Sequence, residues 1–268
     1  MNIGALISKT AEKAQYIFDK KAAKTCGKTL LKDVDNSALK PLKKDLVTLS
    51  NKNPQHSLNI INNLKTDFEQ KFGSELNING LLRFRKKGNL SIDELKEFTK
   101  TLDEGFSELK ELGFDLPKKV HIDLPLTSRL EKNLGGVHVM GRDSIYLNPE
   151  LMTHDKRVVL DTIYHEYGHY MHEKTSPSLY KKLSTHMAFK SFLPKPILKK
   201  LSPLTKEDSE FLYKCYLEPN PIELVPITFS DLIRVKGDWS KLCYGTEEDY
   251  TKLKEIYNKL GGPQVIKK

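Results

Sequence analysis

The sequence predicts an α+β fold, with a mostly helical N-terminal region over residues 1–115 and a second domain over 116–268 that carries a small, antiparallel-edged sheet. Three observations predict this. Apolar residues recur at helical spacing before residue 115, short β-type runs follow between 120 and 148, and helical spacing returns from residue 155. At 268 residues, with 38% hydrophobic and 29% charged residues, the chain has the composition of a globular protein with a substantial core.

Two segments of the N-terminal region are expected to be amphipathic helices. Their apolar residues recur at three- and four-residue steps, namely Leu58, Ile61, Leu64, Phe68 and Phe72 in the first and Leu95, Phe98, Leu102, Phe106, Leu109 and Leu112 in the second. Ser91 and Glu94 form a capping box at the start of the second helix, and glycines 73 and 113 end the two helices. We interpret the stripes as core faces. The segment 249–262 predicts a further amphipathic helix that ends at two glycines.

Three short runs with strand character follow, at 120–124, 136–140 and 144–148. The last two are separated only by Gly-Arg-Asp, a turn-like triplet, and predict a hairpin. His121 and His138 fall on these strands, where alternation favours positions on the sheet surface over a role as metal ligands. The glycines that open the 136–140 strand would let an extended peptide approach closely, so we expect this strand to bind substrate by β-strand addition.

The most informative segment is HEYGH, residues 165–169. On a helix, residues four apart lie on one face, so His165 and His169 could bind the same metal ion while Glu166 reaches a water beside it. The segment follows the strands directly and contains no proline. The alternative interpretation is two surface histidines on an amphipathic helix.

A catalytic zinc needs a third protein ligand. His172 is rejected because it lies about 10 Å along the helix axis from His165; a subsite or surface role is expected for it instead. His172 also stands where the metzincin motif has glycine, which excludes that class. The better candidate is Glu223, placed in the first turn of a later helix by Asn220 as its cap and Pro221 at its first position. Glu218 is the rival ligand.

With these residues in place, region 118–235 resembles the gluzincin metallopeptidases, and most closely the catalytic domain of the anthrax lethal-factor-like proteases. The resemblance consists of the HEYGH helix followed by a Tyr-x3-Asn-x2-Glu segment, here Tyr216, Asn220 and Glu223, and an aromatic residue at Phe229. It implies a zincin-like fold in 116–268 and an endopeptidase that uses zinc (Zn2+) as its cofactor. His165, His169 and Glu223 would bind zinc, Glu166 would be the general base, and Tyr216 would stabilise the oxyanion.

Two positions depart from the family pattern. Pro226 stands where the family has a small residue and removes a helical N–H donor just after Glu223. Ile227 replaces an acid that could orient a histidine, and Asp231 is the candidate to take over that function. These departures keep open an alternative, a catalytically decayed zincin fold that serves as a binding or scaffold protein.

Charge, cysteines and hydropathy define the remaining expectations. The net charge is +9, but nearly all basic residues are lysines scattered among acids, which favours a solvated surface over specific binding of nucleic acid. The 3 cysteines show no CxxC spacing and suit a reducing compartment. No apolar run approaches the about 20 residues of a transmembrane segment. We expect a monomer that acts on a protein or peptide substrate, either cytoplasmic or secreted without a cleaved signal peptide. The family resemblance, together with the separate helical N-terminal region, implies a bacterial effector or toxin.

Overall fold

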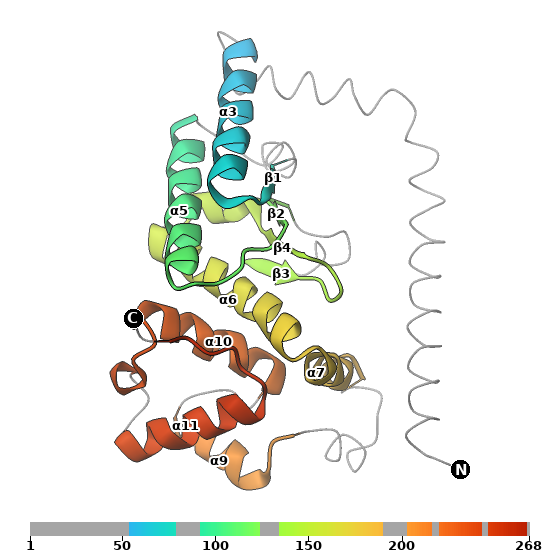
Figure 1. Ribbon diagram of the computed structural model, residues 1–268, viewed down its shortest axis with the longest axis vertical. Helices are drawn as coiled ribbons and strands as arrows, with labels where there is room; N and C mark the ends of the chain where they lie inside the picture. Colours follow the sequence, from blue (N-terminus) through green and yellow to red (C-terminus); the bar gives the residue numbers. More distant parts are fainter. Residues whose placement is uncertain are drawn as a thin grey trace, which may run out of the picture. The chain divides into compact units, whose positions relative to one another are not determined.

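The computed structural model describes residues 54–78, 92–123, 134–189, 203–215, 220–242 and 246–266. The chain divides into two compact units, Met1–Pro54 and Gln55–Lys268, and all described residues except Pro54 belong to the second. This unit combines helices with one small mixed sheet, so the predicted α+β class is confirmed (Figure 1).

The elements alternate between helices and short strands in the first half and are helical in the second (Figure 1). The first half contains α3 (Pro54–Phe72), β1 (Glu75–Asn77), α5 (Ile92–Glu111), β2 (Lys119–His121), β3 (Gly136–His138), β4 (Ser144–Leu147) and the 3-10 helix η1 (Pro149–Thr153). The second half contains α6 (Lys156–Thr175), α7 (Pro177–Phe189), α9 (Lys206–Lys214), α10 (Pro221–Arg234), the 3-10 helix η2 (Trp239–Lys241) and α11 (Glu247–Lys259).

The strands of the described region form a sheet in the order β1-β2-β4-β3. β1, β2 and β4 are parallel neighbours, whereas β3 pairs antiparallel with β4 and lies at one edge. The predicted hairpin and the antiparallel edge are therefore confirmed. In its register Val137 lies opposite Tyr146 and His138 opposite Ile145. Every residue of β4 is buried, as expected for an interior strand covered by helices.

The compact unit begins near residue 55, so its boundary differs from the one expected at 115. β1 joins the sheet through β2, with Leu76 opposite Val120. α5 packs against α6, where Leu160 and Ile163 surround Gly105. A three-residue strand and helices with one apolar face cannot form a core by themselves. The helices before residue 115 therefore share a core with the HEYGH helix.

The predicted apolar stripes of α3 and α5 face each other. Phe68 and Phe72 of α3 contact Phe106 of α5, with ring centroids 5.3 and 5.9 Å apart. Leu102 and Leu109 of α5 are fully buried. The interpretation of these stripes as core faces is confirmed for the described residues. Ser91, one half of the predicted capping box, lies outside them.

α6 is the central helix of the unit and carries HEYGH. Asp155 caps it by accepting hydrogen bonds from the backbone N–H groups of Arg157 and Val158, at 2.8 and 3.1 Å. All residues from Glu166 to His172 are buried, and α5, the sheet, α7 and α10 all pack against α6 (Figure 1). Close packing on several sides restricts the side-chain conformations of this helix, which suits a site that needs fixed geometry.

α10 begins as predicted, with the Asn220 side chain accepting from the Ile222 N–H and Pro221 in the first turn. Pro226 lies inside the helix, which continues to Arg234. α10 packs along α6 (Figure 1). Glu223 in the first turn therefore lies beside the HEYGH segment, since both are in the stretch where the two helices meet.

Two further helices follow α6, namely α7, which starts at Pro177, and α9, which Thr205 and Asp208 cap reciprocally. The predicted C-terminal helix is α11, and Gly261 after it adopts a φ of 79°. Among the described residues, no helix combines the length and the apolar character needed to cross a membrane.

Candidate metal centre

Three predicted ligands converge between α6 and α10. His165 Nε2 lies 3.2 Å from a Glu223 carboxylate oxygen, and His169 Nε2 lies 3.3 Å from the same oxygen. One ligand atom from each residue lies within 4.8 Å of the other two. Within the described residues this is the group of histidine, cysteine and acidic side chains that is arranged to hold a metal ion.

The two His–Glu distances are compatible with a tetrahedral zinc ion. Bonds of about 2.0–2.1 Å to a tetrahedral ion place neighbouring ligand atoms about 3.3 Å apart, close to the two His–Glu distances. Two imidazoles and one carboxylate are also a donor set used by catalytic zinc, which leaves a position open for water or substrate. His165 and Glu223 are partly exposed, with side-chain exposures of 28% and 39%, whereas His169 is at 11%. The centre is thus accessible from the side of His165 and Glu223.

The charges around the centre are coupled. Burial opposes ionisation of Glu223, but hydrogen bonds with His165 and His169 hold the pKa of this carboxyl well below its usual range. Burial also lowers the pKa of His169, whereas for His165 the effect of burial is outweighed by Glu223 and Glu166, which raise its pKa. A divalent cation requires an ionised glutamate and imidazole nitrogens that have lost their protons. The low pKa of Glu223 therefore favours metal binding, whereas the raised pKa of His165 opposes it.

Glu166 lies next to the ligands and is only 5% exposed. Burial raises the pKa of Glu166 to about 7, against the opposing effects of His165 and of a hydrogen bond from the His138 backbone N–H. Gly136 approaches this side chain so closely that a Cβ at position 136 would lie 2.6 Å from Glu166 Cγ. A carboxyl with a pKa near neutrality can both accept and donate a proton at physiological pH.

The two glycines at the start of the hairpin have a different neighbour from the one expected. The space beside Gly136 is filled by Glu166, and the space beside Gly135 by Thr162, whose Cγ2 lies 3.1 Å from a Cβ position on Gly135. Both neighbours belong to α6. The glycines therefore permit the close approach of α6 to the hairpin, a contact between distant residues that the strand pattern does not predict.

Other predicted residues have mixed outcomes. Tyr216, the expected oxyanion stabiliser, and Glu218, the rival ligand, lie outside the described residues. Phe229 is fully buried and packs on Tyr167, with ring centroids 5.9 Å apart. Asp231, the candidate to orient a histidine, has an ion pair with Arg234 at 3.4 Å.

His172 is not part of the metal-binding group, as predicted, but it is not a surface or subsite residue either. It is fully buried, and its Nε2 lies 2.7 Å from the Leu260 carbonyl oxygen. Since a carbonyl only accepts, Nε2 carries the proton and donates it. His172 therefore attaches α6 to the end of α11.

Two features of the site were not predicted. His138, expected on the sheet surface, is buried because α6 covers it, and its ring lies against Tyr170 and Tyr180. Tyr180 of α7 also packs on the rings of His169 and His172, with centroids 6.3 and 5.2 Å away. These contacts join residues from three elements, so no spacing within the sequence indicates them.

The comparisons with known proteins identify no relative. No protein-family model matches the chain, and no significant match is found among curated proteins or solved structures.

Proposed function

We propose that this chain is a zinc-dependent endopeptidase of the gluzincin type, resembling the lethal-factor-like proteases. The observation that carries the proposal is the convergence of His165, His169 and Glu223 with a buried Glu166 at their side. Two histidines four residues apart could arise by chance. A glutamate from a separate helix, reaching 3.2 and 3.3 Å from both of them, is much harder to explain by chance.

His165, His169 and Glu223 would hold the ion. When bound, zinc would supply Lewis-acid chemistry, generating a nucleophilic water near neutral pH and polarising the scissile carbonyl. The partly exposed side chains of His165 and Glu223 would face the substrate. The buried His169 would anchor the site to α6.

Glu166 would move the proton. Its carboxylate would take a proton from the attacking water and pass it to the nitrogen of the leaving amine, which breaks the peptide bond. A pKa raised to about 7 by burial serves both transfers. Tyr216 is proposed to donate a hydrogen bond from its hydroxyl group to the oxyanion, in keeping with the family resemblance.

The proposed substrate is a protein or extended peptide. β3 lies at the edge of the sheet and carries the residue whose backbone contacts Glu166, which supports β-strand addition beside the site. The protein is proposed to act as a monomeric effector or toxin on a protein target. It would act either in the cytoplasm or after secretion without a cleaved signal peptide.

The test uses the full-length chain, zinc content measured by mass spectrometry, and cleavage of fluorescently labelled casein and a mixed-sequence peptide library. The wild type is expected to hold one zinc and to cleave. Glu166→Gln should keep zinc and lose about 10²–10⁴-fold in rate. Glu223→Ala should lose zinc and activity together, and Glu210→Gln on the exposed face of α9 is the matched control. A wild-type chain that holds no zinc rules out the proposal and leaves the decayed scaffold.

A further inference from the structure

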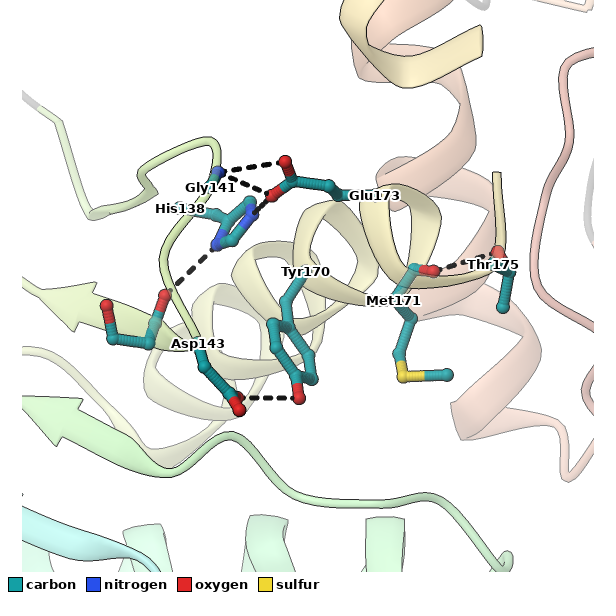
Figure 2. Close-up of polar contacts among 8 residues, drawn as sticks. His138, Gly141, Asp143, Tyr170, Met171, Glu173 and Thr175 are labelled. Atoms are coloured by element: carbon teal, nitrogen blue, oxygen red, sulfur yellow. Dashed lines mark hydrogen bonds and ion pairs between the residues drawn. The ribbon is translucent and has the colours of Figure 1, made fainter. Parts of the chain in front are cut away.

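A second glutamate of α6 points at the hairpin from the same helix face as Glu166. Glu173 lies seven residues after Glu166, a spacing that places both on one side of the helix. Its carboxylate accepts the Gly141 N–H at 2.8 and 3.1 Å and lies 2.6 Å from His138 Nε2 (Figure 2). We call these contacts of Glu173 with Gly141 and His138 the hairpin latch.

The His138 ring is held at both nitrogens. Nδ1 lies 3.0 Å from the Ser144 carbonyl oxygen, which only accepts, so Nδ1 carries a proton. Nε2 faces the Glu173 carboxylate, and one proton lies between them. The side chain of His138 is fully buried and that of Glu173 is 20% exposed, so water competes little for this pair. Together they connect β3, the start of β4 and α6 (Figure 2).

The backbone of the same histidine reaches the proposed general base. Asn148 N donates to Gly135 O, so by antiparallel alternation Gly135 and Val137 pair with the neighbouring strand while the His138 N–H points away from β4. That N–H donates to the Glu166 carboxylate. One residue of β3 thus contacts Glu173 with its side chain and Glu166 with its main chain.

We propose that Glu173 and the His138 side chain are positioning residues that hold β3 on α6, so that the His138 N–H fixes the Glu166 carboxylate for proton transfer. This inference rests on the proposed function for its catalytic consequence, but the positioning itself is a property of the fold. Glu166 transfers the same proton as described above, and its positioning involves no further chemical step. Misplacement of a catalytic group by about 1 Å costs on the order of 10²-fold in rate, so a strand held by a few contacts is a sensitive point.

A second contact between α6 and the hairpin provides a control for general loosening of the hairpin. Tyr170 of α6 donates its hydroxyl to Asp143 at 2.9 Å, so it too links α6 to the hairpin, but at the turn side rather than at β3 (Figure 2). Tyr170→Phe removes this hydrogen bond and keeps the ring. If the latch acts by positioning Glu166, loss of Glu173 must have effects that loss of the Tyr170 hydroxyl does not.

The first measurement is the hydrogen-exchange rate of the His138 backbone amide, monitored by NMR on the full-length, 15N-labelled, zinc-loaded chain. Glu166→Ala removes the acceptor and defines the exchange rate of the free amide. Glu173→Ala is expected to raise the rate at least about tenfold towards that value, Glu173→Gln to fall between, and Tyr170→Phe to resemble the wild type. Unchanged exchange in Glu173→Ala overturns the latch, whether or not the chain cleaves peptides.

The second measurement is kcat and KM on the casein and peptide probes. Glu173→Ala is expected to lower kcat by about 10–100-fold at wild-type zinc content, with partial rescue by Glu173→Gln. Faster His138 exchange with an unchanged kcat overturns the positioning role. A wild-type chain that cleaves neither probe rules out the proposed endopeptidase function but not the hairpin latch. The hydrogen-exchange data then test the latch by themselves. Should Glu173→Ala fail to fold, the isosteric Glu173→Gln carries both comparisons.

Discussion

Gly168 of α6 lies directly against Pro226 of α10. A Cβ at position 168 would be 2.8 Å from Pro226 Cα and 3.0 Å from Pro226 Cβ, closer than real atoms approach. The proline that appeared in the sequence to weaken the second helix is therefore the residue on which the HEYGH helix packs. Because Glu223 lies one turn before Pro226, we expect this contact to set the distance between the glutamate and the two histidines.

Gly168→Ala is expected to push α6 and α10 apart, since the atoms in the way are backbone and ring atoms that cannot rotate. We expect a loss of about 1–3 kcal/mol in the free energy of unfolding and a zinc affinity about 10–100-fold weaker. Denaturant unfolding and competition with a chromophoric chelator measure the two. Gly105→Ala is the matched control, because its nearest atom is a Leu160 methyl at 3.1 Å that can move. Equal zinc affinity in Gly168→Ala and wild type would show that the contact does not set the ligand spacing.

Zinc is expected to stabilise the folded chain, since an ion that binds only the folded state raises the melting temperature by mass action. At about 100 times Kd the gain is about 2.7 kcal/mol. Differential scanning fluorimetry with zinc and with EDTA measures it. Glu223→Ala should abolish the shift, whereas His154→Ala removes an exposed histidine outside the centre and should keep it. A shift of the same size in both variants would place the zinc elsewhere.

His172 is expected to make stability depend on pH. Burial lowers its pKa to about 4, and the contact with Leu260 offsets this only in part. Because the folded pKa lies below the ordinary value of about 6.5, protons prefer the unfolded chain, and this contribution is complete above about pH 6.5 and lost as the pH falls towards 4. The difference is about 3 kcal/mol.

The measurement for His172 is urea unfolding of metal-free protein between pH 7 and 4, which leaves zinc release out of the comparison. His172→Gln keeps a donor for the Leu260 carbonyl and has no titration of its own. Its free energy of unfolding should fall less steeply with pH than that of the wild type. Parallel curves would contradict the assignment of the pH dependence to His172.

Asp208 is expected to tie α9 to α11. Burial opposes its ionisation, but Lys259 at 2.7 Å and the capping contacts with Thr205 hold the pKa of this carboxyl well below its usual range. Its stabilising contribution is thus present above about pH 4 and lost at lower pH. Asp208→Asn should lower the free energy of unfolding by about 1.5–3 kcal/mol in denaturant titrations at pH 7.

Glu210→Gln is the control for Asp208, since it neutralises an exposed i,i+4 pair with Lys206 on the same helix. Such a pair contributes about 0.3–0.5 kcal/mol. A loss in Asp208→Asn no larger than that of the control would mean that the link between the two helices contributes little to stability.

Much of the fold and most of the described part of the site could be predicted from local patterns. The stripes of α3 and α5, the β3–β4 hairpin, the cap of α10 and the histidine pair each depend on residues a few positions apart, whose spacing determines which side chains share a face. β1 was missed because three residues are too few to show alternation. The burial of His138 was missed because what covers it lies 35 residues further along the chain.

Local sequence patterns are enough to show which groups this chain can offer: two histidines one helical turn apart, a glutamate beside the first, and a capped helix that presents a second glutamate. Whether these groups meet depends on how the helices and the hairpin pack in three dimensions. Glu223 reaches the histidines because Gly168 admits Pro226, and Glu166 meets the His138 amide because Gly136 admits the glutamate. Such contacts join distant residues and depend on close packing of whole elements, which local hydrogen bonding and periodicity do not specify.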